Sequence, residues 1–460
     1  MADGSLPPDA TDWRAPATWR DPYPHYARLR GSGPLHWSPQ FFGGAWLVTG
    51  HDDCEAVLRD PRFSAQRTGG WIGQALARRW GLDGEGAPPD DAAALSAGAG
   101  GVDDAARAER LAFQRFFARS LIFLDAPHHG RVRKLMQKAF APVALRASQA
   151  AISAMADEHL DAVDAALQRG ETVDWMPTVA RAMPARVIAH LLGVPLQPQF
   201  VAWSDDIAAF IGAVQPGRRQ FMAASRALRQ LTAWFEQHLE VRARAGTPPE
   251  SAGDLVGHLL AHTDWDEDQS ARTEGRESGP GDSAPLSRAE LIAQCAMLLF
   301  AGHETTRNLL GNGLLALLQH PATWRDLADH PEAASGAVRE LLRWDSPVQY
   351  TGRRLVSDLH WHGQTLRRGD LVIALIGSAN RDPARYAHPD QLDIRRDAGL
   401  HLSFGQGPHL CIGLGLSHIE AETVFARAAR RWPTLQIASS AFDTANAVYR
   451  GLEHLQIRLG

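Results

Sequence analysis

A glycine-rich stretch near the end of the chain, HLSFGQGPHLCIGLG, surrounds a single cysteine, Cys411. Gly405, Gly407 and Gly413 permit positive φ angles and let the backbone approach a ligand closely. Backbone N–H groups turned toward the sulfur, and the positive end of a helix starting near Cys411, would stabilise a thiolate. No CxxC pattern accompanies Cys411, so a zinc site is poorly supported. A lone thiolate suits a metal that brings its other ligands with it, as haem does.

A second segment, FAGHETT, places an acid and two threonines inside an apolar run. Ala301 and Thr305 are four residues apart and therefore share one face of a helix, which Met297 extends. A threonine in mid-helix can donate to the carbonyl four residues earlier and bend the helix. Together with Gly302, the small alanine leaves room for a small ligand such as dioxygen. Glu304 adds an ionisable group to this apolar surrounding.

The element that must position this second segment is one very long helix, SRAELIAQCAMLLFAGHETTRNLLGNGLLALLQHP. Ser287 and Glu290 form a capping box at its start, and Pro321 ends it. The helix is apolar on most faces, so it is expected to be buried and to cross the whole domain.

The chain as a whole is predicted to be mostly α with a small β portion, in a single large domain spanning residues 1–460. Apolar residues recur every three or four positions from about 129 to 260, which is typical of helices. The β-rich part is expected mainly at 34–60, at 350–375 and in C-terminal strands near 435–438 and 455–459, and the helical part mainly at 129–345 and 411–431. Two polar stretches, 81–104 and 264–285, are predicted to be surface loops.

Composition narrows the functional class. The chain has 460 residues and a formal net charge of −5, which argues against nucleic acid as the main partner. The first twenty residues have no apolar core, so neither a signal peptide nor a membrane anchor is expected. The three cysteines, Cys54, Cys295 and Cys411, are few and well separated, which favours a cytoplasmic protein without disulfides.

The motifs resemble those of the cytochrome P450 family. FGQGPHLCIG (404–413) is similar to the family's haem-binding signature, F-G-x-G-x-H-x-C-x-G, and AGHET is similar to its oxygen-activation motif. The resemblance runs from about residue 20 to the end of the chain. It implies the P450 fold, with the long helix crossing over haem b, iron protoporphyrin IX, and Cys411 as the axial ligand of the iron. Further cofactor-binding residues implied are Phe404, Gly405, His409 and Ala301, with Glu304 and Thr305 as the catalytic residues that assist proton delivery.

Charged motifs extend the resemblance. Glu340 and Arg343 match the family's structural E-x-x-R pair, and Arg396 is the candidate third partner because position 391, where an arginine is usual, is Gln. His129 and Arg133 are four residues apart on one helical face, a spacing that could grip a carboxylate. By resemblance these two residues, Arg353 and His409 bind the haem propionates; Arg354 lies next to Arg353 and could be confused with it.

The predicted function is that of a monooxygenase that oxidises a small, hydrophobic or aromatic, natural-product-like substrate. Electrons are expected from NAD(P)H through an external ferredoxin reductase and a ferredoxin, and the protein is expected to be a monomer. The ferredoxin is expected to dock near the basic run Arg131, Arg133, Lys134 and Lys138. Predicted substrate contacts are Met297, Ala301, Phe117 and Trp71, with Phe113, Phe116, Leu121 and Ile122 as further candidates.

Four alternatives stay open at this point. The same haem could serve oxidative aryl or C–C coupling, and the sequence does not separate this from hydroxylation. A peroxide-driven peroxygenase typically lacks the pair Glu304 and Thr305. A haem-free, P450-like module that recruits a carrier protein is expected to lose the cysteine ligand, whereas Cys411 is present. A haem sensor or carrier would not need the acid–alcohol pair.

Overall fold

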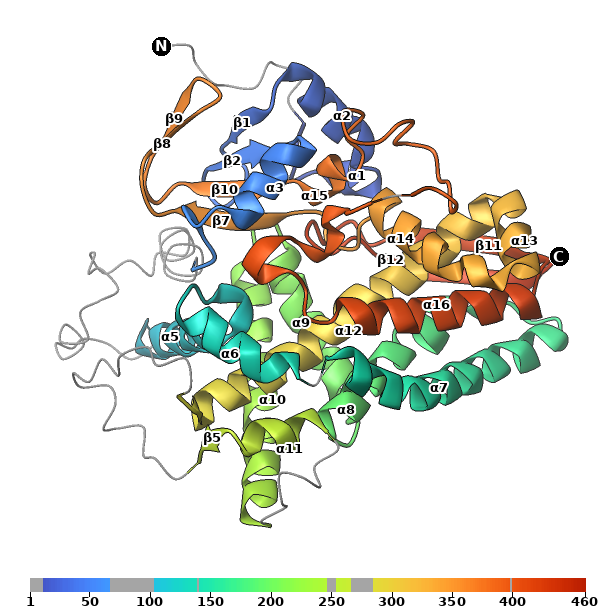
Figure 1. Cartoon of the computed structure of the whole chain (residues 1–460), viewed down its shortest axis with the longest axis horizontal. Helices are drawn as coiled ribbons and strands as arrows, with labels where there is room; N and C mark the ends of the chain where they lie inside the picture. Colours follow the sequence, from blue (N-terminus) through green and yellow to red (C-terminus); the bar gives the residue numbers. More distant parts are fainter. Residues whose placement is uncertain (1–10, 67–102, 139, 246–253, 266–283, 398) are drawn as a thin grey trace.

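The computed structural model describes residues 11–66, 103–138, 140–245, 254–265, 284–397 and 399–460. Figure 1 shows a β-rich part, built from blue N-terminal strands and orange strands of residues 351–374, packed beside a larger body of helices. The predicted class, mostly α with a small β portion, is confirmed. Trp71 and most of the two polar stretches lie outside the described residues.

The bounds of the helices follow in chain order. They are α1 (Pro16–Arg20), α2 (Tyr23–Ser32), α3 (His51–Arg59), α5 (Asp103–Arg119), η3 (Leu121–Phe123), α6 (His128–Gln137), α7 (Pro142–Gln168), η4 (Met176–Ala180), α8 (Ala182–Leu192), α9 (Gln199–Gly212), α10 (Arg218–Arg244), α11 (Leu255–Leu260), α12 (Arg288–Gln319), α13 (Pro321–Asp329), η7 (Pro331–Ala333), α14 (Ala334–Trp344), α15 (Ile376–Ala379), η8 (Leu402–Phe404), η9 (Gly407–His409) and α16 (Leu414–Arg431). None of these described helices is both long and apolar enough to cross a membrane.

The strands form one five-stranded sheet and three smaller ones. They are β1 (Leu35–Ser38), β2 (Ala45–Val48), β3 (Phe63–Ser64), β4 (Val173–Asp174), β5 (Thr263–Asp264), β6 (Leu286–Ser287), β7 (Thr351–Leu355), β8 (Leu359–Trp361), β9 (Gln364–Leu366), β10 (Leu371–Ala374), β11 (Leu435–Phe442) and β12 (Leu452–Leu459). The large sheet has the order β1-β2-β10-β7-β3, and the others are β11-β12-β4, β5-β6 and β8-β9.

Strand pairing in the large sheet joins segments that are far apart in the chain. Strand β10 runs parallel to β2, with Val372 opposite Trp46, and antiparallel to β7, with Val372 opposite Arg353. The strand regions predicted at 34–60 and 350–375 are therefore present and pair with one another, whereas the predicted C-terminal strands, β11 and β12, pair with each other and with β4. Strands β4, β5 and β6 and the π-helix η4 lie within the range expected to be helical. A two-residue strand carries no period of its own, so sequence periodicity does not indicate it.

Helix α12 agrees with its prediction at both ends. The Ser287 hydroxyl accepts from the Glu290 N–H (3.2 Å), and the Glu290 carboxylate accepts from the Ser287 N–H (2.8 Å). The helix ends at Gln319, and Pro321 begins α13. Its 32 residues span about 48 Å at the usual helical rise. Helices α8, α9, α10 and α16 pack around it, and Figure 1 shows it running through the middle of the helical body.

Candidate active site

One cavity of about 340 Å³ lies between α12 and the loop that carries Cys411. The predicted site residues that line it are Phe404, Gly405, His409, Cys411, Met297, Ala301, Glu304, Thr305, His129, Arg133 and Arg353. The fold therefore brings the glycine-rich stretch, the acid–alcohol segment and the cationic candidates to one space, although they come from four separate regions of the sequence.

The cysteine loop is held in shape by its own backbone. Gly405 and Gly407 have φ angles of +70° and +68°, a region that favours glycine. A Cβ at Gly407 would lie 3.2 Å from the Cα of Arg59 in α3, so only glycine fits there without displacing that helix. The Cys411 N–H donates to the Phe404 carbonyl (2.8 Å), which closes the loop. Helix α16 begins three residues later, as expected.

The Cys411 thiol faces the cavity, whereas the other two cysteines are fully buried in the core. Removal from water raises the pKa of the Cys411 thiol, while the N–H groups of Gly413 and Leu414 and the charge of Arg133 act to lower it. These groups are placed to stabilise a thiolate once a metal ion replaces the proton, because a coordinated thiol is deprotonated.

A cationic group occupies another part of the cavity wall. The rings of His129 and His409 lie 4.1 Å apart between centroids, and Arg133 donates to the Leu410 carbonyl (2.7 Å). Arg353, which is buried, donates to the Gly352 carbonyl (2.8 Å). Within the described ranges no carboxylate lies within 4.0 Å of either arginine.

Asp125 acts on this cluster only through its charge at a distance, and burial is the larger effect on both Arg353 and His129. Burial lowers the pKa of Arg353 to about 10. Burial and the charge of Arg133 lower the pKa of His129, whose Nε2 has no hydrogen-bond partner in the described part of the chain. Buried cations are normally paired. The neighbouring Arg354 has a different environment, since its Nη1 donates to the Gly369 carbonyl (2.5 Å) and it does not line the cavity.

Three residues expected to share one face of α12 do face the cavity, whereas Gly302 does not. Thr305 Oγ1 donates to the Ala301 carbonyl (3.1 Å), and both residues line the cavity together with Met297. Gly302 does not line it, so the expectation that this glycine leaves room for a small ligand is wrong. A Cβ at Gly302 would lie 2.9 Å from the Ile188 side chain, so the missing side chain lets α8 pack closely against α12.

Glu304 is fully buried and belongs to a polar chain that leads toward the surface. Its Oε1 accepts from Arg307 (2.7 Å), and Arg307 donates to Asp205 of α9 (2.8 Å), which also pairs with Arg181 (3.4 Å). Burial raises the pKa of Glu304 to about 7, although Arg307 acts to lower it. The side chain of Asp205 is 35% exposed, so this chain of charges connects the cavity wall with solvent. Arg307 could have been found from its i+3 spacing; Asp205, in another helix, could not.

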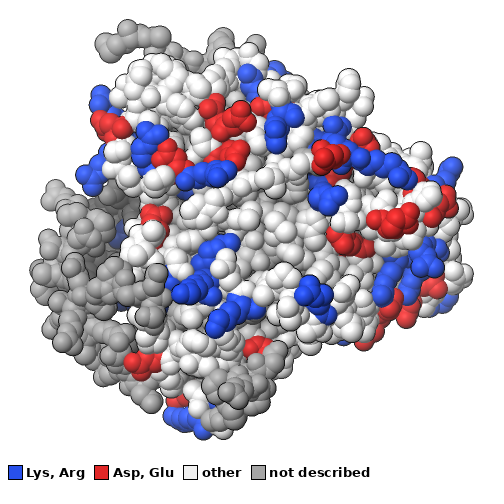
Figure 2. Space-filling view, in the orientation of Figure 1, with Lys and Arg blue, Asp and Glu red and all other residues white. Residues whose placement is uncertain are grey.

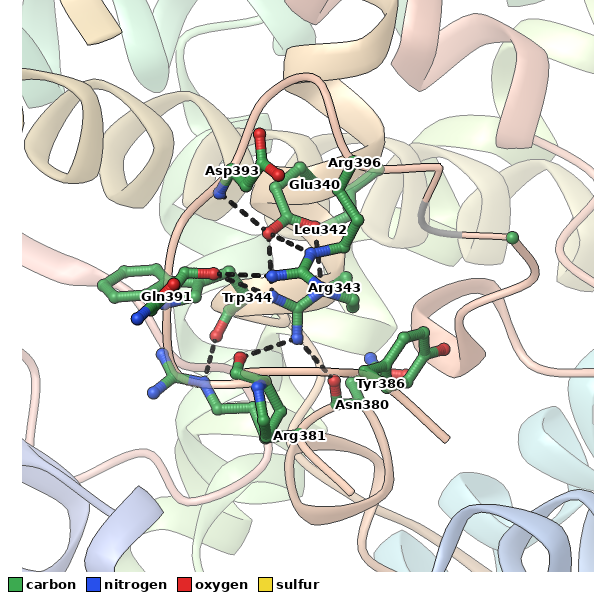
Figure 3. A network of polar contacts seen from close by, with 12 residues as sticks. Glu340, Leu342, Arg343, Trp344, Asn380, Arg381, Tyr386, Gln391, Asp393 and Arg396 are labelled. Carbon is green, nitrogen blue, oxygen red and sulfur yellow. Dashed lines mark hydrogen bonds and ion pairs between the residues drawn. The ribbon is translucent and has the colours of Figure 1, made fainter. Parts of the chain in front are cut away.

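The E-x-x-R pair is the centre of a network of polar contacts, which Figure 3 shows. Glu340 and Arg343 are fully buried and form two hydrogen bonds of 2.8 Å, and Arg396 donates to the same carboxylate (3.1 Å). Both arginines also donate to the backbone carbonyl of Gln391 (3.3 Å each). The residue at 391 thus contributes its main chain, and Arg396 occupies the place of the third partner.

A polar side chain that sequence reasoning missed connects this network to the cysteine loop. The carbonyl of Asn380 accepts from Arg343 (2.9 Å), while its side chain accepts from the Leu402 N–H (2.7 Å) and donates to Ser403 (2.8 Å). Leu402 and Ser403 belong to η8, which ends at Phe404, the first residue of the cysteine motif. The buried charges therefore fix the approach to the loop rather than reach the cavity themselves.

Two expectations need correction. Phe117 does not line the cavity; it is fully buried among other rings, with the ring of Phe113 4.7 Å away between centroids. Helical spacing turns Phe117 toward the core, and Leu121 and Ile122 of the next turn line the cavity instead. Arg131 is not a free surface cation, because it forms an ion pair with Glu290 and donates to the Pro285 carbonyl (3.0 Å).

The residues present fit a haem. A flat dianionic macrocycle would give the unpaired cations Arg133 and Arg353 their missing carboxylates, and the thiol of Cys411 would supply the metal ligand. The rest of the cavity wall is largely apolar, as an organic ring system requires.

Comparisons with known proteins agree with a haem-binding cavity of this kind. Residues 267–433 match the family model described as Cytochrome P450. The chain is 31% identical to the vitamin D(3) 25-hydroxylase of Pseudonocardia autotrophica, over 96% of this chain and 94% of that protein. The crystal structure of P450BioI with a hexadec-9Z-enoic acid-ligated acyl carrier protein is similar (TM-score 0.77, 27% identity, 96% of this chain and 100% of that chain). So is that of CYP164A2 from Mycobacterium smegmatis with econazole bound (TM-score 0.76, 31% identity, 97% and 98%). Identity at this level over nearly the whole length, with the thiol, the cations and the α12 segment gathered around one cavity, shows that the chain belongs to the cytochrome P450 family of monooxygenases.

Proposed function

We propose that this chain is a haem-thiolate monooxygenase that uses dioxygen and two electrons from separate redox partners to oxidise a small apolar substrate. The observation that carries the proposal is the single cavity lined by both Cys411 and the pair Glu304 and Thr305. In this proposal the domain spans the whole chain, and the other assignments below follow from the positions of the residues around that cavity.

The haem-binding roles divide between one ligand and four propionate partners. Cys411 ligates the iron, and the N–H groups of Gly413 and Leu414 hold the negative charge on its sulfur. Arg133, Arg353, His129 and His409 bind the propionates. Bound there, a haem supplies the activation of dioxygen that a P450 monooxygenase requires.

Proton delivery is assigned to the α12 face and the polar chain behind it. Thr305 presents its hydroxyl to the cavity and Glu304 holds a proton near neutral pH, because burial raises its pKa to about 7. Asp205 and Arg307 connect Glu304 with solvent, so that the carboxyl can be reprotonated after each transfer.

An apolar substrate is supported by the cavity wall and by two relatives. Leu121, Ile122, Met297, Leu298 and Tyr449 contribute carbon-rich surface to the cavity. The relatives are named for vitamin D(3) and for a fatty acid carried by a carrier protein, both of which are largely apolar. Ala301 leaves space next to Thr305, where the reacting part of the substrate would lie.

The redox partner is assigned to the surface over α6. Lys134 and Lys138 are exposed there, and they are the only two lysines in the 460 residues, against 45 arginines. Figure 2 shows Lys and Arg side chains gathered over this helix. Arg133 of the same helix donates to the carbonyl of Leu410, next to Cys411, so the surface lies close to the metal ligand. An acidic ferredoxin is the partner that such a surface fits.

Docking can be tested with a charge-reversal pair. The double variant Lys134→Glu, Lys138→Glu should slow reduction by an acidic ferredoxin at least tenfold at low salt, an effect of the order seen for steered association. The matched control is Arg395→Glu, which changes an exposed ion pair with Asp326 on another part of the surface. Equal reduction rates for the two variants would assign the docking site elsewhere.

The test of the whole proposal is the absorption spectrum of the reduced protein under carbon monoxide. A strongly red-shifted Soret band is expected for the unaltered chain and for the control Cys54→Ser, but not for Cys411→Ser. A band at the position typical of histidine or thiol ligation would show that Cys411 is not a thiolate ligand. Absence of any haem band would refute the enzyme and favour a carrier-protein interaction module.

A further inference from the structure

A buried amide of α12, Gln294, joins this helix to the end of α5. Gln294 is fully buried; its Oε1 accepts from the Leu121 N–H (2.9 Å), and its Nε2 donates to the Arg119 carbonyl (2.6 Å). Arg119 ends α5 and Leu121 begins η3. At helix ends backbone groups lose their helical partners. One side chain supplies both partners at this turn, with Ser120 between them.

The same turn separates two cavities. On one side, Leu121, Ile122 and Gln294 line the cavity that contains Cys411. On the other side, Arg119 and Ala293 line a second cavity of about 200 Å³ between α5, α10 and α12. In each of the two chain segments, residues that are close in sequence therefore face different cavities: Leu121 and Gln294 face the first, and Arg119 and Ala293 face the second. The turn is a thin wall, and Gln294 is what ties it to the long helix.

We infer that Gln294 is a positioning residue that fixes this wall and thereby sets the affinity of the substrate cavity for bulky apolar ligands. The inference rests on the proposed function. Without the amide, the buried N–H of Leu121 and the partly buried carbonyl of Arg119 would lose their partners, which is costly, so the turn would move to satisfy them. The second cavity gives it space to do so. A bulky ligand would then have to order the wall when it binds, whereas a small ligand would not.

The experiment compares Gln294→Leu with Asn312→Leu in the haem-loaded protein. Asn312 is a second buried amide of α12; it donates to the Arg450 carbonyl (2.9 Å) and does not line the cavity. The probes are econazole, a bulky azole, and imidazole, both titrated by the change in the haem spectrum. Gln294→Leu should raise the Kd of econazole about tenfold and leave that of imidazole within about twofold, the size expected for one or two lost hydrogen bonds. Asn312→Leu should change neither the Kd of econazole nor that of imidazole.

Amide hydrogen exchange gives a second readout that does not need haem. The Leu121 N–H should lose protection in Gln294→Leu and keep it in Asn312→Leu. Gln294→Glu, which keeps the size and the acceptor for Leu121 but not the donor for Arg119, should fall between these variants and serves if Gln294→Leu does not fold. Unchanged econazole affinity, equal weakening of both azoles, or unchanged protection of Leu121 would overturn the inference. Failure of the proposed function would appear separately, as a missing haem band with the exchange result intact.

Discussion

Replacing Glu340 by glutamine removes the negative charge that faces two arginines behind the cysteine loop. The carboxylate accepts four hydrogen bonds: two of 2.8 Å from Arg343, one of 3.1 Å from Arg396 and one of 3.0 Å from the Asp393 N–H. Three of the four converge on Oε1. The glutamine oxygen would take that place, and its NH₂ group would then face the Nε–H of Arg343, so that two donors meet.

The cost follows from the burial of the pair. Arg343 is fully buried and would keep its charge without a counter-ion, and leaving one member of such a pair alone costs about 3–5 kcal/mol. Typical domains are stable by about 5–15 kcal/mol, so the loss is a large fraction of the total. Arg343 also holds the carbonyls of Asn380 and Pro389, and the shift should therefore spread to the segment that leads to Cys411.

The assay is urea unfolding, followed both by far-ultraviolet circular dichroism and by the Soret band at matched haem loading. Glu340→Gln should lose about 3–5 kcal/mol of the free energy of unfolding, and the Soret band should be lost at lower urea than the helical signal. The control is Arg395→Gln, which breaks an exposed pair with Asp326 and should cost under about 1 kcal/mol. If Glu340→Gln cost no more than this control, the reasoning about the buried charge would be wrong.

Three further predictions concern individual side chains. Thr305→Ala should lower product formation on the order of 10²-fold while NADPH consumption continues, with the difference released as hydrogen peroxide; product and peroxide measured against NADPH would show it, and unchanged coupling would exclude the proposed role. Glu420, buried in α16, has its pKa raised by burial to about 8. Between about pH 5 and 8 the native state therefore keeps a proton that the unfolded state has already lost, so stability falls as the pH rises, by about 1.4 kcal/mol per pH unit. Glu420→Gln should reduce by this amount the slope of stability against pH in urea unfolding curves across that range, leaving the part that Glu304 contributes, and an unchanged slope would contradict the assignment. Arg353→Leu should release haem about 10–100-fold faster to an acceptor protein. The haem-free chain should be at least as stable as the unaltered one, because a buried unpaired cation is gone. An unchanged rate of haem release, or a less stable haem-free chain, would argue against this prediction.

Features that depend on local contacts could be predicted from the sequence. The capping box at Ser287 and the pair Glu340–Arg343 depend on spacings of three residues within one helix, which the helical geometry determines. The position of Cys411 at the start of α16 follows in the same way from the glycines around it. These features are encoded by neighbours in the chain, so no knowledge of the tertiary structure is needed to predict them.

Features that depend on the packing of distant segments could not be predicted in this way. Phe117 was expected in the pocket because of its type and region, but which face of α5 meets α10 and α12 depends on the packing of all three helices. The bond of Gln294 to Leu121 spans 173 positions, and that of Arg307 to Asp205 spans 102. Gly302 was assigned to ligand space for the same reason, since its close contact with Ile188 of α8 has no local signal.

The pairing of β2 with β10 has a consequence for biosynthesis. The central part of the large sheet forms only after residues 371–374 have been made, more than 300 positions after its partner at 45–48. The metal ligand follows at 411, and β12, which closes the smaller sheet against β4, ends at Leu459. During translation, β2 therefore remains unpaired with β10 until most of the chain has been synthesised. We therefore expect haem binding to come late in folding, and nascent chains to depend on chaperones until these strands have paired.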